Sequence, residues 1–388
     1  MIPAPHGGRL IDRLASETVR DRRDAELADL PRVATAIDQL YDAEKIGIGA
    51  YSPLEGFMDG ETLRAVLQLG RLPGGLPWTM PIHFPLPEGR GAESLKDVGP
   101  GDDVALLDRE GRAIALLSVE EEFPLDRGEI ARSAYGTDDP AHPNVADILG
   151  AGSRAWSGKI TLLRRLPPIA GRPEPGPAET REEFQRRGWK TVAAYQCRNP
   201  PHTAHEYIQR VTLEREDVDG LFVHPVVGRL KKGDYRPDVI LEAYESLVRH
   251  YYPADRVMVA PLGITMRYGG PKAALFLAIV RKNYGCGAYI VGRDQAGVGK
   301  YYDPYACHRI FDEYDVGILP LRYEESFFCR RCGWMASRKT CPHEASERAS
   351  ISQTKIREIL ASGGALPTDV LRPEVAEILR RPGVTITT

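Results

Sequence analysis

The chain has 388 residues, of which 42% are hydrophobic and 27% charged, and this composition excludes a largely disordered protein. Its 51 Lys and Arg residues nearly balance its 54 Asp and Glu residues, so a net charge of −3 excludes a general electrostatic attraction to nucleic acid. There is no run of 18 apolar residues and no secretion-type leader pattern, so we expect neither a membrane span nor export.

Residues 1–168 are predicted to form a mixed, mostly β domain. The segment DGETLRAVLQLG, at 59–70, has the apolar spacing of a helix that ends at Gly70, and it is the one clear helix of this part. A strand-like run between prolines follows at 78–86, and two apolar runs around a polar turn predict a β-hairpin over 102–121.

A segment rich in proline and glycine, at 166–178, is predicted to be a linker. Beyond it, Thr180 and Glu183 have the spacing of a capping box that opens a short helix. A second domain is therefore expected to begin near residue 169.

Residues 169–325 alternate between short apolar strands and amphipathic helices. The strands are expected at 189–196, 220–228, 255–263 and 287–294, and the helices at 202–216, 236–252 and 271–285. This alternation predicts a parallel α/β sheet. Ligands of such sheets bind at the carboxyl ends of the strands, near a topological switch point, and the polar motifs of this chain fall at those ends.

The segment YQCRNPPHTAHE, at 195–206, concentrates polar side chains at one such strand end. Asn199 is predicted to cap the next helix, with both prolines in the first turn, so that the positive end of the helix faces the site. His202 and His205 share one face of this helix and can donate to phosphate oxygens. Arg198 adds a planar cation that fits a tetrahedral oxyanion. The segment therefore predicts a site for phosphates and an oxyanion.

Two other interpretations of this corner remain open. One histidine could cap the helix while the other lies on the surface. The pair could instead bind zinc, although the spacing is three residues and no Glu lies between the histidines as in the HExxH motif.

The segment QCRNPPHTAHE closely resembles the QTRNPxHxxHE signature of the ATP sulfurylase (sulfate adenylyltransferase) family. Over about residues 50–360 further segments resemble the same family in the same order: YSPLEGFMDGETLRAVL, AYGTDDPAHPNV, FVHPVVGRLKKGD, MRYGGPKAALFLAIVRKNYGC and IVGRDQAGVGKYY. The resemblance implies an N-terminal PUA-like barrel, a central Rossmann-like nucleotidylyltransferase domain and a small C-terminal domain.

The family's reaction, implied by this resemblance, converts ATP and sulfate into adenylyl sulfate and pyrophosphate by direct attack of a sulfate oxygen on the α-phosphorus. It needs no protein nucleophile, only positioning and charge stabilisation. The implied sulfate ligands in this motif are Gln196 and Arg198, and the implied ATP ligands are Gln196, Asn199, His202 and His205. The implied catalytic residues are Cys197, Arg198, Asn199, His202 and His205.

The segment GRDQAGVG, at 292–299, resembles the family's GRDHAGVG. The resemblance implies that the backbone amide of Ala296 contacts sulfate, and that ATP is bound by Gly292, Arg293, Asp294 and Gln295. Without the first motif, a tight loop after a strand would be the simpler interpretation. His224, Lys231 and Lys232 follow another strand and are either pocket-edge residues or part of a solvated basic loop.

Two positions depart from the family pattern. Cys197 replaces a threonine, and a thiol is a poorer hydrogen-bond partner than a hydroxyl. Gln295 replaces a histidine, and a neutral amide cannot become cationic. We therefore expect the activity to be kept, with an altered nucleotide affinity or pH dependence.

Residues 326–388 are predicted to form a small domain with short helices at 352–364 and 372–381. The segment CRRCGWMASRKTCPH offers four candidate ligands of a structural zinc ion: Cys329, Cys332, Cys341 and His343. The alternative is four reduced side chains without a metal.

The segment SQTKIRE resembles a helix start found in nucleotidylyltransferases. In this interpretation Ser352 or Thr354 caps the helix, while Lys355 and Arg357 reach phosphates. An ordinary capped amphipathic helix is the alternative.

Two rival functions are an adenylyltransferase of the same fold with a different acceptor, and a zinc-ribbon module that binds nucleic acid or protein. The near-neutral charge and the phosphate corner count against the second. There is no GxxxxGK[ST] motif, so a fused adenylyl sulfate kinase is not expected. We expect Mg²⁺ with ATP, a homodimer or larger homo-oligomer, no nucleic-acid or membrane partner, and a cytoplasmic location, which the clustered cysteines favour.

Overall fold

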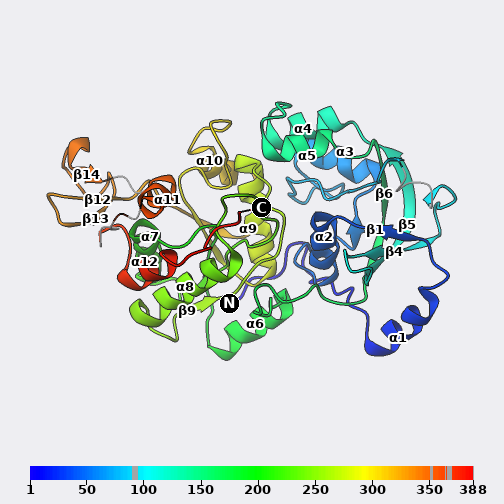
Figure 1. The fold of residues 1–388 in the computed structure, drawn as a ribbon, viewed down its shortest axis with the longest axis horizontal. Helices are drawn as coiled ribbons and strands as arrows, with labels where there is room; N and C mark the ends of the chain where they lie inside the picture. Colours follow the sequence, from blue (N-terminus) through cyan, green and yellow to red (C-terminus); the bar gives the residue numbers. More distant parts are fainter. Residues whose placement is uncertain (90–94, 350–352, 363, 365–368, 388) are drawn as a thin grey trace.

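The computed structural model describes residues 1–89, 95–349, 353–362, 364 and 369–387. Figure 1 shows an elongated molecule with the N-terminal residues (blue to cyan) on one side and the later residues on the other. Strands β12 to β14 form a small lobe at the far end from the N-terminal part. No helix in the described part of the chain is long and apolar enough to cross a membrane.

A six-stranded sheet forms the centre of the N-terminal part. Its strands are β1 (Arg32–Ala34), β2 (Gly56–Phe57), β3 (Phe84–Pro85), β4 (Asp103–Leu107), β5 (Ala113–Pro124) and β6 (Arg154–Leu162). They pair in the order β1-β4-β5-β6-β2, with β3 also on β6. β4 and β5 are antiparallel, which confirms the predicted hairpin. Among the described residues β1 and β2 do not pair, so a closed barrel stays a prediction.

The N-terminal part is more helical than predicted. Its helices are α1 (Glu17–Glu26), α2 (Ile37–Gly47), α3 (Gly60–Leu69), α4 (Arg127–Tyr135) and α5 (Pro143–Leu149). Helix α3 confirms the predicted helix: Asp59 accepts from the Thr62 N–H at 2.7 Å, and Gly70 ends it at φ 64°. The expectation of a mostly β domain with one clear helix is wrong, because α1, α2, α4 and α5 also form there. Helix α1 buries no residue and carries no apolar stripe, whereas α2 buries Leu40, Ala43 and Ile46 together with charged side chains.

The predicted linker contains no regular helix or strand over 166–176. Helix α6 (Pro177–Arg186) begins before the predicted capping box, so that prediction is wrong. Thr180 lies inside the helix, where its hydroxyl donates to the Tyr284 carbonyl at 2.8 Å. The reason is Pro177, which favours the first helical position because no N–H is needed there.

A five-stranded parallel sheet forms the second part of the molecule. Its strands are β7 (Val192–Tyr195), β8 (Gly220–Val223), β9 (Val257–Val259), β10 (Ala288–Val291) and β11 (Leu319–Arg322). The first four confirm predicted strands, and β11 was not predicted. The order β9-β8-β7-β10-β11 reverses direction between β7 and β10. The topological switch point therefore lies at the carboxyl ends of these two strands.

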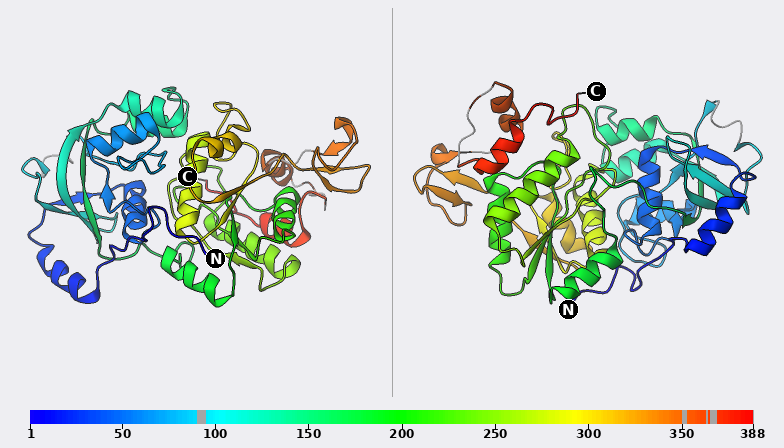
Figure 2. Two further views of the ribbon diagram at one scale, coloured as in Figure 1. Left: turned by 180° about the vertical axis from the view of Figure 1, so that it is seen from behind. Right: turned by 60° about the horizontal axis from the view of Figure 1, so that its bottom comes forward.

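Helices cover both faces of this sheet (Figure 2, right). They include α7 (Thr203–Leu213), α8 (Pro237–Tyr251), α9 (Gly270–Asn283) and α10 (Ala306–Glu313), of which the first three confirm predicted helices. Helix α9 lies between the two parts of the molecule (Figure 1). The ring of Phe276 on α9 packs against Tyr51 and Trp78 of the N-terminal part, with ring centroids 5.2 and 5.5 Å apart. One hydrophobic core is therefore continuous across both parts.

The C-terminal residues form a three-stranded antiparallel sheet and two helices. The strands are β12 (Phe327–Cys329), β13 (Trp334–Ala336) and β14 (Arg348–Ala349), and the helices α11 (Gln353–Ala361) and α12 (Pro373–Leu379) confirm the predicted pair. Helix α12 packs on α8 and buries Val375, Ile378 and Leu379. The predicted cap at Ser352 lies outside the described residues, and so does the side chain of Thr354.

The C-terminal tail returns to the parallel domain and pairs with the loop that precedes α8. The Gly233 N–H donates to the Ile386 carbonyl and the Ile386 N–H to the Asp234 carbonyl, both at 2.9 Å. The Arg236 N–H donates to the Val384 carbonyl at 3.0 Å. The tail thus fixes the backbone on both sides of Asp234.

Candidate active site

A cavity of about 510 Å³ opens at the carboxyl ends of β7 and β10. Its walls contain every residue predicted to bind sulfate or ATP or to act in catalysis: Gln196, Cys197, Arg198, Asn199, His202, His205, Gly292, Arg293, Asp294, Gln295 and Ala296. Two motifs almost a hundred residues apart in sequence meet there because β7 and β10 are neighbours, with Ala194 opposite Tyr289. The position agrees with the switch-point rule for open α/β sheets.

The junction between β7 and α7 differs from its prediction in detail. Helix α7 begins at Thr203, with His202 in extended backbone at φ −128° before it, so Asn199 does not cap the helix. The residue before a proline is disfavoured in helical conformation, and Asn199 and Pro200 both precede prolines. The Asn199 side chain instead accepts a hydrogen bond at 2.9 Å from Arg357 of α11.

The rings of His202 and His205 stack, with centroids 3.6 Å apart and planes at 21°. Burial lowers the pKa of His205 to about 4, and burial with the neighbouring His205 lowers the pKa of His202 well below its usual value. Both rings are therefore neutral at pH 7 in the free protein. Neither Nδ1 has a hydrogen-bond partner among the described residues. The pair offers uncommitted polar atoms at the positive end of a helix, where anions bind.

Arg198 is held from two sides inside the cavity. Its Nη2 lies 2.9 Å from Oδ2 of Asp234, and its guanidinium lies over the Tyr268 ring at 5.0 Å. The same Asp234 carboxylate accepts from the Lys231 N–H at 3.1 Å. The cation is thus fixed in place before any ligand binds.

A chain of side-chain hydrogen bonds links the two motifs. Gln295 Nε2 donates to the Tyr289 hydroxyl at 3.2 Å, and that hydroxyl donates to Gln196 Oε1 at 3.1 Å. Burial raises the pKa of Tyr289 to about 12, so the hydroxyl keeps its proton. Because Oε1 of Gln196 is occupied, its NH₂ group remains to donate to a ligand.

The loop after β10 has unusual backbone geometry. Asp294 and Ala296 have φ values of 55° and 58°, in a region that L-residues other than Asn and Asp seldom adopt. A Cβ on Gly297 would lie 2.1 Å from Oδ1 of Asp294, so a larger residue there would displace the Asp294 side chain. Residues with positive φ, such as Asp294 and Ala296, cluster at ligand sites, where the surrounding fold directs backbone amides toward an anion.

Two of the three pocket-edge candidates lie elsewhere. His224 is wrong as a pocket residue, because its ring is fully buried against Phe222 and Tyr284, with ring centroids 4.3 and 4.7 Å away. Lys231 lines the cavity, whereas Lys232 is exposed outside its lining. The interpretation as a solvated basic loop therefore holds for Lys232.

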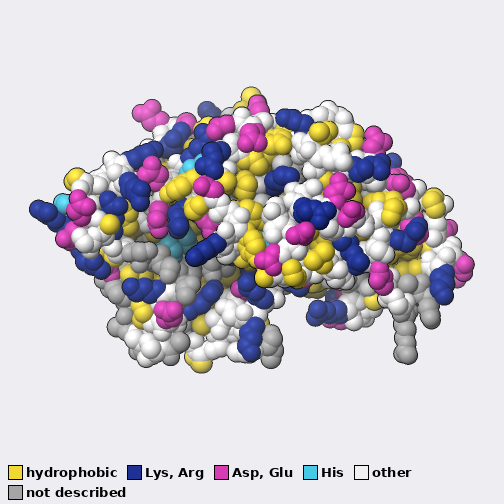
Figure 3. All heavy atoms as spheres, turned by 90° about the horizontal axis from the view of Figure 1, so that it is seen from above, with side chains coloured by type: hydrophobic (Ala, Val, Ile, Leu, Met, Phe, Trp, Pro, Cys, Tyr) yellow, Lys and Arg dark blue, Asp and Glu magenta, His cyan; other side chains and the backbone are white. Residues whose placement is uncertain are grey.

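Sequence reasoning missed Asp234, Tyr268 and Tyr289. Asp234 and Tyr268 lie in segments that were matched only as whole motifs, and Tyr289 lies in a predicted strand. A single tyrosine or aspartate carries no local signal of a site. Charged side chains of both signs are interspersed over the face shown in Figure 3. This agrees with a site for a small ligand rather than a surface for a long polyanion.

The model of the ATP-sulfurylase family matches residues 174–382. The sulfate adenylyltransferase of Hyperthermus butylicus is 45% identical over 98% of this chain and 96% of its own length. That of Symbiobacterium thermophilum is also 45% identical, over 97% of this chain and 95% of its own length.

The chain belongs to the ATP-sulfurylase family. The PUA-like domain model matches residues 3–165, in agreement with the expected N-terminal part. A solved structure described as a hexameric APS kinase from Thiobacillus denitrificans superimposes with a TM-score of 0.77 at 24% identity, covering 99% of this chain and 69% of that one. That likeness shows the fold alone.

Cys197 and Gln295, the two departures from the ATP-sulfurylase signature, both line the cavity. Burial raises the pKa of the Cys197 thiol to about 12, so it stays neutral and is no nucleophile. Gln295 takes a place in the hydrogen-bond chain through Tyr289, where only a donor is required. A histidine at this position could donate in the same way.

The cysteine and histidine cluster lies in the β12–β14 lobe. The ligand atoms of Cys329, Cys332, Cys341 and His343 all lie within 4.8 Å of one another. Cys332 Sγ is 3.8 Å from Cys341 Sγ and 3.2 Å from His343 Nδ1. Tetrahedral zinc with bonds of about 2.3 Å to sulfur needs S···S distances of about 3.8 Å, so the cluster fits such an ion.

Proposed function

We propose that this ATP-sulfurylase family member is a sulfate adenylyltransferase, which forms adenylyl sulfate and pyrophosphate from ATP and sulfate. The observation that carries the proposal is the convergence of both motifs on one cavity at the switch point. The alternative, an adenylyltransferase with a different acceptor, would share the nucleotide half of this cavity. The fixed Arg198 and the donor group of Gln196 favour a small oxyanion.

In the proposed reaction a sulfate oxygen attacks the α-phosphorus of ATP. The bond from that phosphorus to the bridging oxygen breaks, and pyrophosphate leaves with the electron pair. We assign Gln196, Arg198 and the Ala296 amide to sulfate. We assign Asn199, His202, His205 and the 292–295 loop to ATP, with the stacked histidines at the leaving pyrophosphate. A neutral imidazole can donate one hydrogen bond without the free-energy cost of burying a charge. It gains a proton if the phosphates raise its pKa.

Mg²⁺ would accompany ATP, neutralising the phosphates, and its coordination would come largely from the nucleotide. Four carboxylates line the same cavity, and because Asp234 pairs with Arg198, those of Asp294, Glu324 and Glu325 are the candidate protein ligands. For the lobe cluster we propose a structural Zn²⁺, because four protein ligands leave no open position for chemistry. Such thiolate ligands suit a reducing compartment, in keeping with the expected cytoplasm.

We further propose a division into residues 1–168, 169–325 and 326–388, and a homodimer or larger homo-oligomer. The break between the two family-model matches, near residue 170, supports the first boundary. The oligomeric state rests on the family resemblance alone, and light scattering of the purified chain would measure it.

The test is a pyrophosphate-release assay with ATP and Mg²⁺ and three acceptors: sulfate, molybdate, and a phosphopantetheine-type acceptor. Sulfate and molybdate should support release, and Arg198→Ala should lower kcat/KM for sulfate by about 100-fold or more, as expected for a lost charge-assisted contact. Arg215→Ala, which removes an exposed arginine paired with Asp217, is the matched control. Release with the third acceptor alone would overturn the proposal in favour of the alternative.

A further inference from the structure

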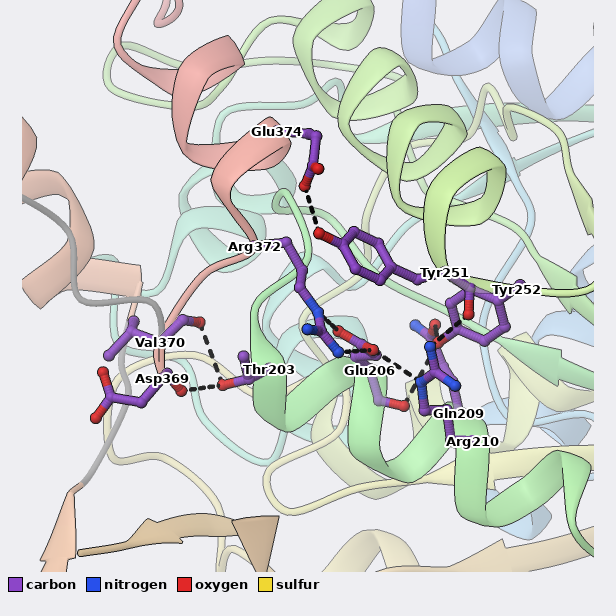
Figure 4. Close-up of polar contacts among 10 residues, drawn as sticks. All are labelled: Thr203, Glu206, Gln209, Arg210, Tyr251, Tyr252, Asp369, Val370, Arg372 and Glu374. Carbon is purple, nitrogen blue, oxygen red and sulfur yellow. Dashed lines mark hydrogen bonds and ion pairs between the residues drawn. The ribbon is translucent and has the colours of Figure 1, made fainter. Parts of the chain in front are cut away.

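The C-terminal segment that precedes α12 lies against the first turns of α7 (Figure 4). The Thr203 N–H donates to the Val370 carbonyl at 3.0 Å, and its hydroxyl donates to the Asp369 carbonyl at 2.7 Å. The first N–H groups of a helix have no partner within the helix, and here a segment 167 residues later in the chain supplies one. The segment therefore closes the end of the helix at which His202 and His205 lie.

A second contact joins the same segment to the next turn. Arg372 donates to both carboxylate oxygens of Glu206, at 2.8 and 2.7 Å, as drawn in Figure 4. The Glu206 side chain is only 4% exposed, and Arg210 also donates to it at 2.7 Å. Burial alone would raise the pKa of Glu206, but the hydrogen bonds from Arg372 and Arg210 outweigh it and hold that pKa below its usual value. A buried carboxylate of this kind depends strongly on its partners.

Arg372 is itself firmly placed. It immediately precedes α12, whose apolar residues are buried against α8. Its guanidinium lies over the Tyr251 ring at 4.2 Å, and the Tyr251 hydroxyl donates to Glu374 at 2.6 Å. The position of Arg372 is thus set by α8 and α12 as well as by its pair with Glu206.

We propose that Arg372 is a positioning residue for the stacked histidines and acts through Glu206. Thr203 follows His202 and Glu206 follows His205, so each contact from the C-terminal segment is made by the residue next to one histidine. This inference rests on the proposed function, in which the histidines meet the pyrophosphate. A displacement of about 1 Å at such a position can cost about 100-fold in rate.

The experiment compares Arg372→Ala with Arg381→Ala in the full-length enzyme. Arg381 is the control, because its Nη1 also donates to both carboxylate oxygens of a glutamate, Glu242, at 2.9 Å, but both partners are about half exposed. We expect Arg372→Ala to lower kcat by about 10- to 100-fold with the KM for sulfate within about twofold, because the assigned sulfate ligands lie directly after β7 and in the 292–296 loop, outside α7. Arg381→Ala should leave both constants unchanged.

An NMR titration of histidine-labelled protein supplies a readout that does not depend on activity. Loosening of the first turn would hydrate the stacked rings and raise their pKa values toward the ordinary histidine value in Arg372→Ala, but not in Arg381→Ala. Arg372→Lys, which keeps the charge without the two-pronged geometry, should remain folded and shift both readouts in the same direction by a smaller amount.

Unchanged kcat and unchanged histidine titration in folded Arg372→Ala or Arg372→Lys would overturn the inference while the proposed function stands. A native enzyme that forms no adenylyl sulfate would overturn the proposed function, and the titration would still report whether Arg372 positions the rings. A fall in kcat with unchanged histidine titration would also count against the inference.

Discussion

The Tyr289 hydroxyl donates a hydrogen bond to Oε1 of Gln196 across 3.1 Å, and so ties β10 to the strand end of β7. This hydrogen bond determines which end of the Gln196 amide group remains free to bind a ligand. Since Oε1 is engaged, the NH₂ group is the part that can meet sulfate.

Tyr289→Phe should therefore raise the KM for sulfate by about 2- to 10-fold, the worth of one hydrogen bond that orients a ligand group. The KM for ATP should change less, because among the residues assigned to ATP only Gln295 loses a contact, its hydrogen bond to the Tyr289 hydroxyl. Initial-rate kinetics with each substrate varied in turn would measure this. Tyr314→Phe, which removes an exposed hydroxyl that donates to Leu69, is the control, and an equal effect of both changes would contradict the orienting role.

Gln295→His restores the residue that the family signature carries. A histidine can donate to the Tyr289 hydroxyl and, unlike glutamine, can become cationic below its pKa. We expect the variant to remain active and its KM for ATP to fall as the pH is lowered from 8 to 6, relative to the native enzyme. Parallel pH profiles that coincide throughout would contradict this expectation.

His205 should make the protein less stable in acid. Its pKa of about 4 in the folded protein lies below that of an unfolded histidine, about 6.5, so the unfolded chain binds the extra proton between these values. Stability is then lost as the pH falls through that window, by up to about 1.4 kcal/mol per pH unit for this one group. Urea unfolding at pH 7.5 and 5.5 would measure the loss.

His205→Asn should reduce this pH-dependent loss because the substituted side chain does not titrate. Other buried histidines contribute to the acid sensitivity of the native protein, so the variant must be compared at both pH values rather than at one. His250→Asn, at an exposed position, is the matched control. A pH-dependent loss as large in His205→Asn as in the native protein would show that His205 is not the buried neutral ring seen here.

The four-ligand cluster should hold one zinc ion per chain. Cys341→Ser should abolish this zinc in metal analysis and lower the thermal stability, because metal binding at such a site contributes folding free energy. Cys286→Ser, at a buried cysteine outside the cluster, should retain the metal. Purified native chain without zinc, after growth with zinc present, would contradict the assignment.

Much of the parallel domain could be predicted because its signals are local. Alternating apolar strands and amphipathic helices gave the elements, and parallel strands bring their carboxyl ends to one edge. The two motifs could thus be assigned to one site before their distance was known. The late start of α7 could also have been predicted, because Asn199 and Pro200 both precede proline.

The partners of the site residues could not be predicted, because they are far apart in sequence. Gln196 and Tyr289 are separated by 93 positions and Arg198 and Asp234 by 36. The strand order and the packing of α12 bring such pairs together. Neither the strand order nor this packing can be predicted from the periodicity of the sequence. Helix α1 was missed for a different reason, since a helix without an apolar stripe leaves no periodic signal.

The pairing of Val384–Ile386 with the loop around Asp234 bears on how the protein can be handled. An affinity tag or surface linker attached to the last residues would strain the backbone hydrogen bonds between the tail and this loop. Those hydrogen bonds position the Asp234 carboxylate beside Arg198. Met1 is 99% exposed and offers an attachment point that leaves these hydrogen bonds undisturbed. Immobilised or fused preparations should therefore be joined through the N-terminus, and a loss of sulfate turnover on C-terminal tethering alone would mark the tail as a working part of the enzyme.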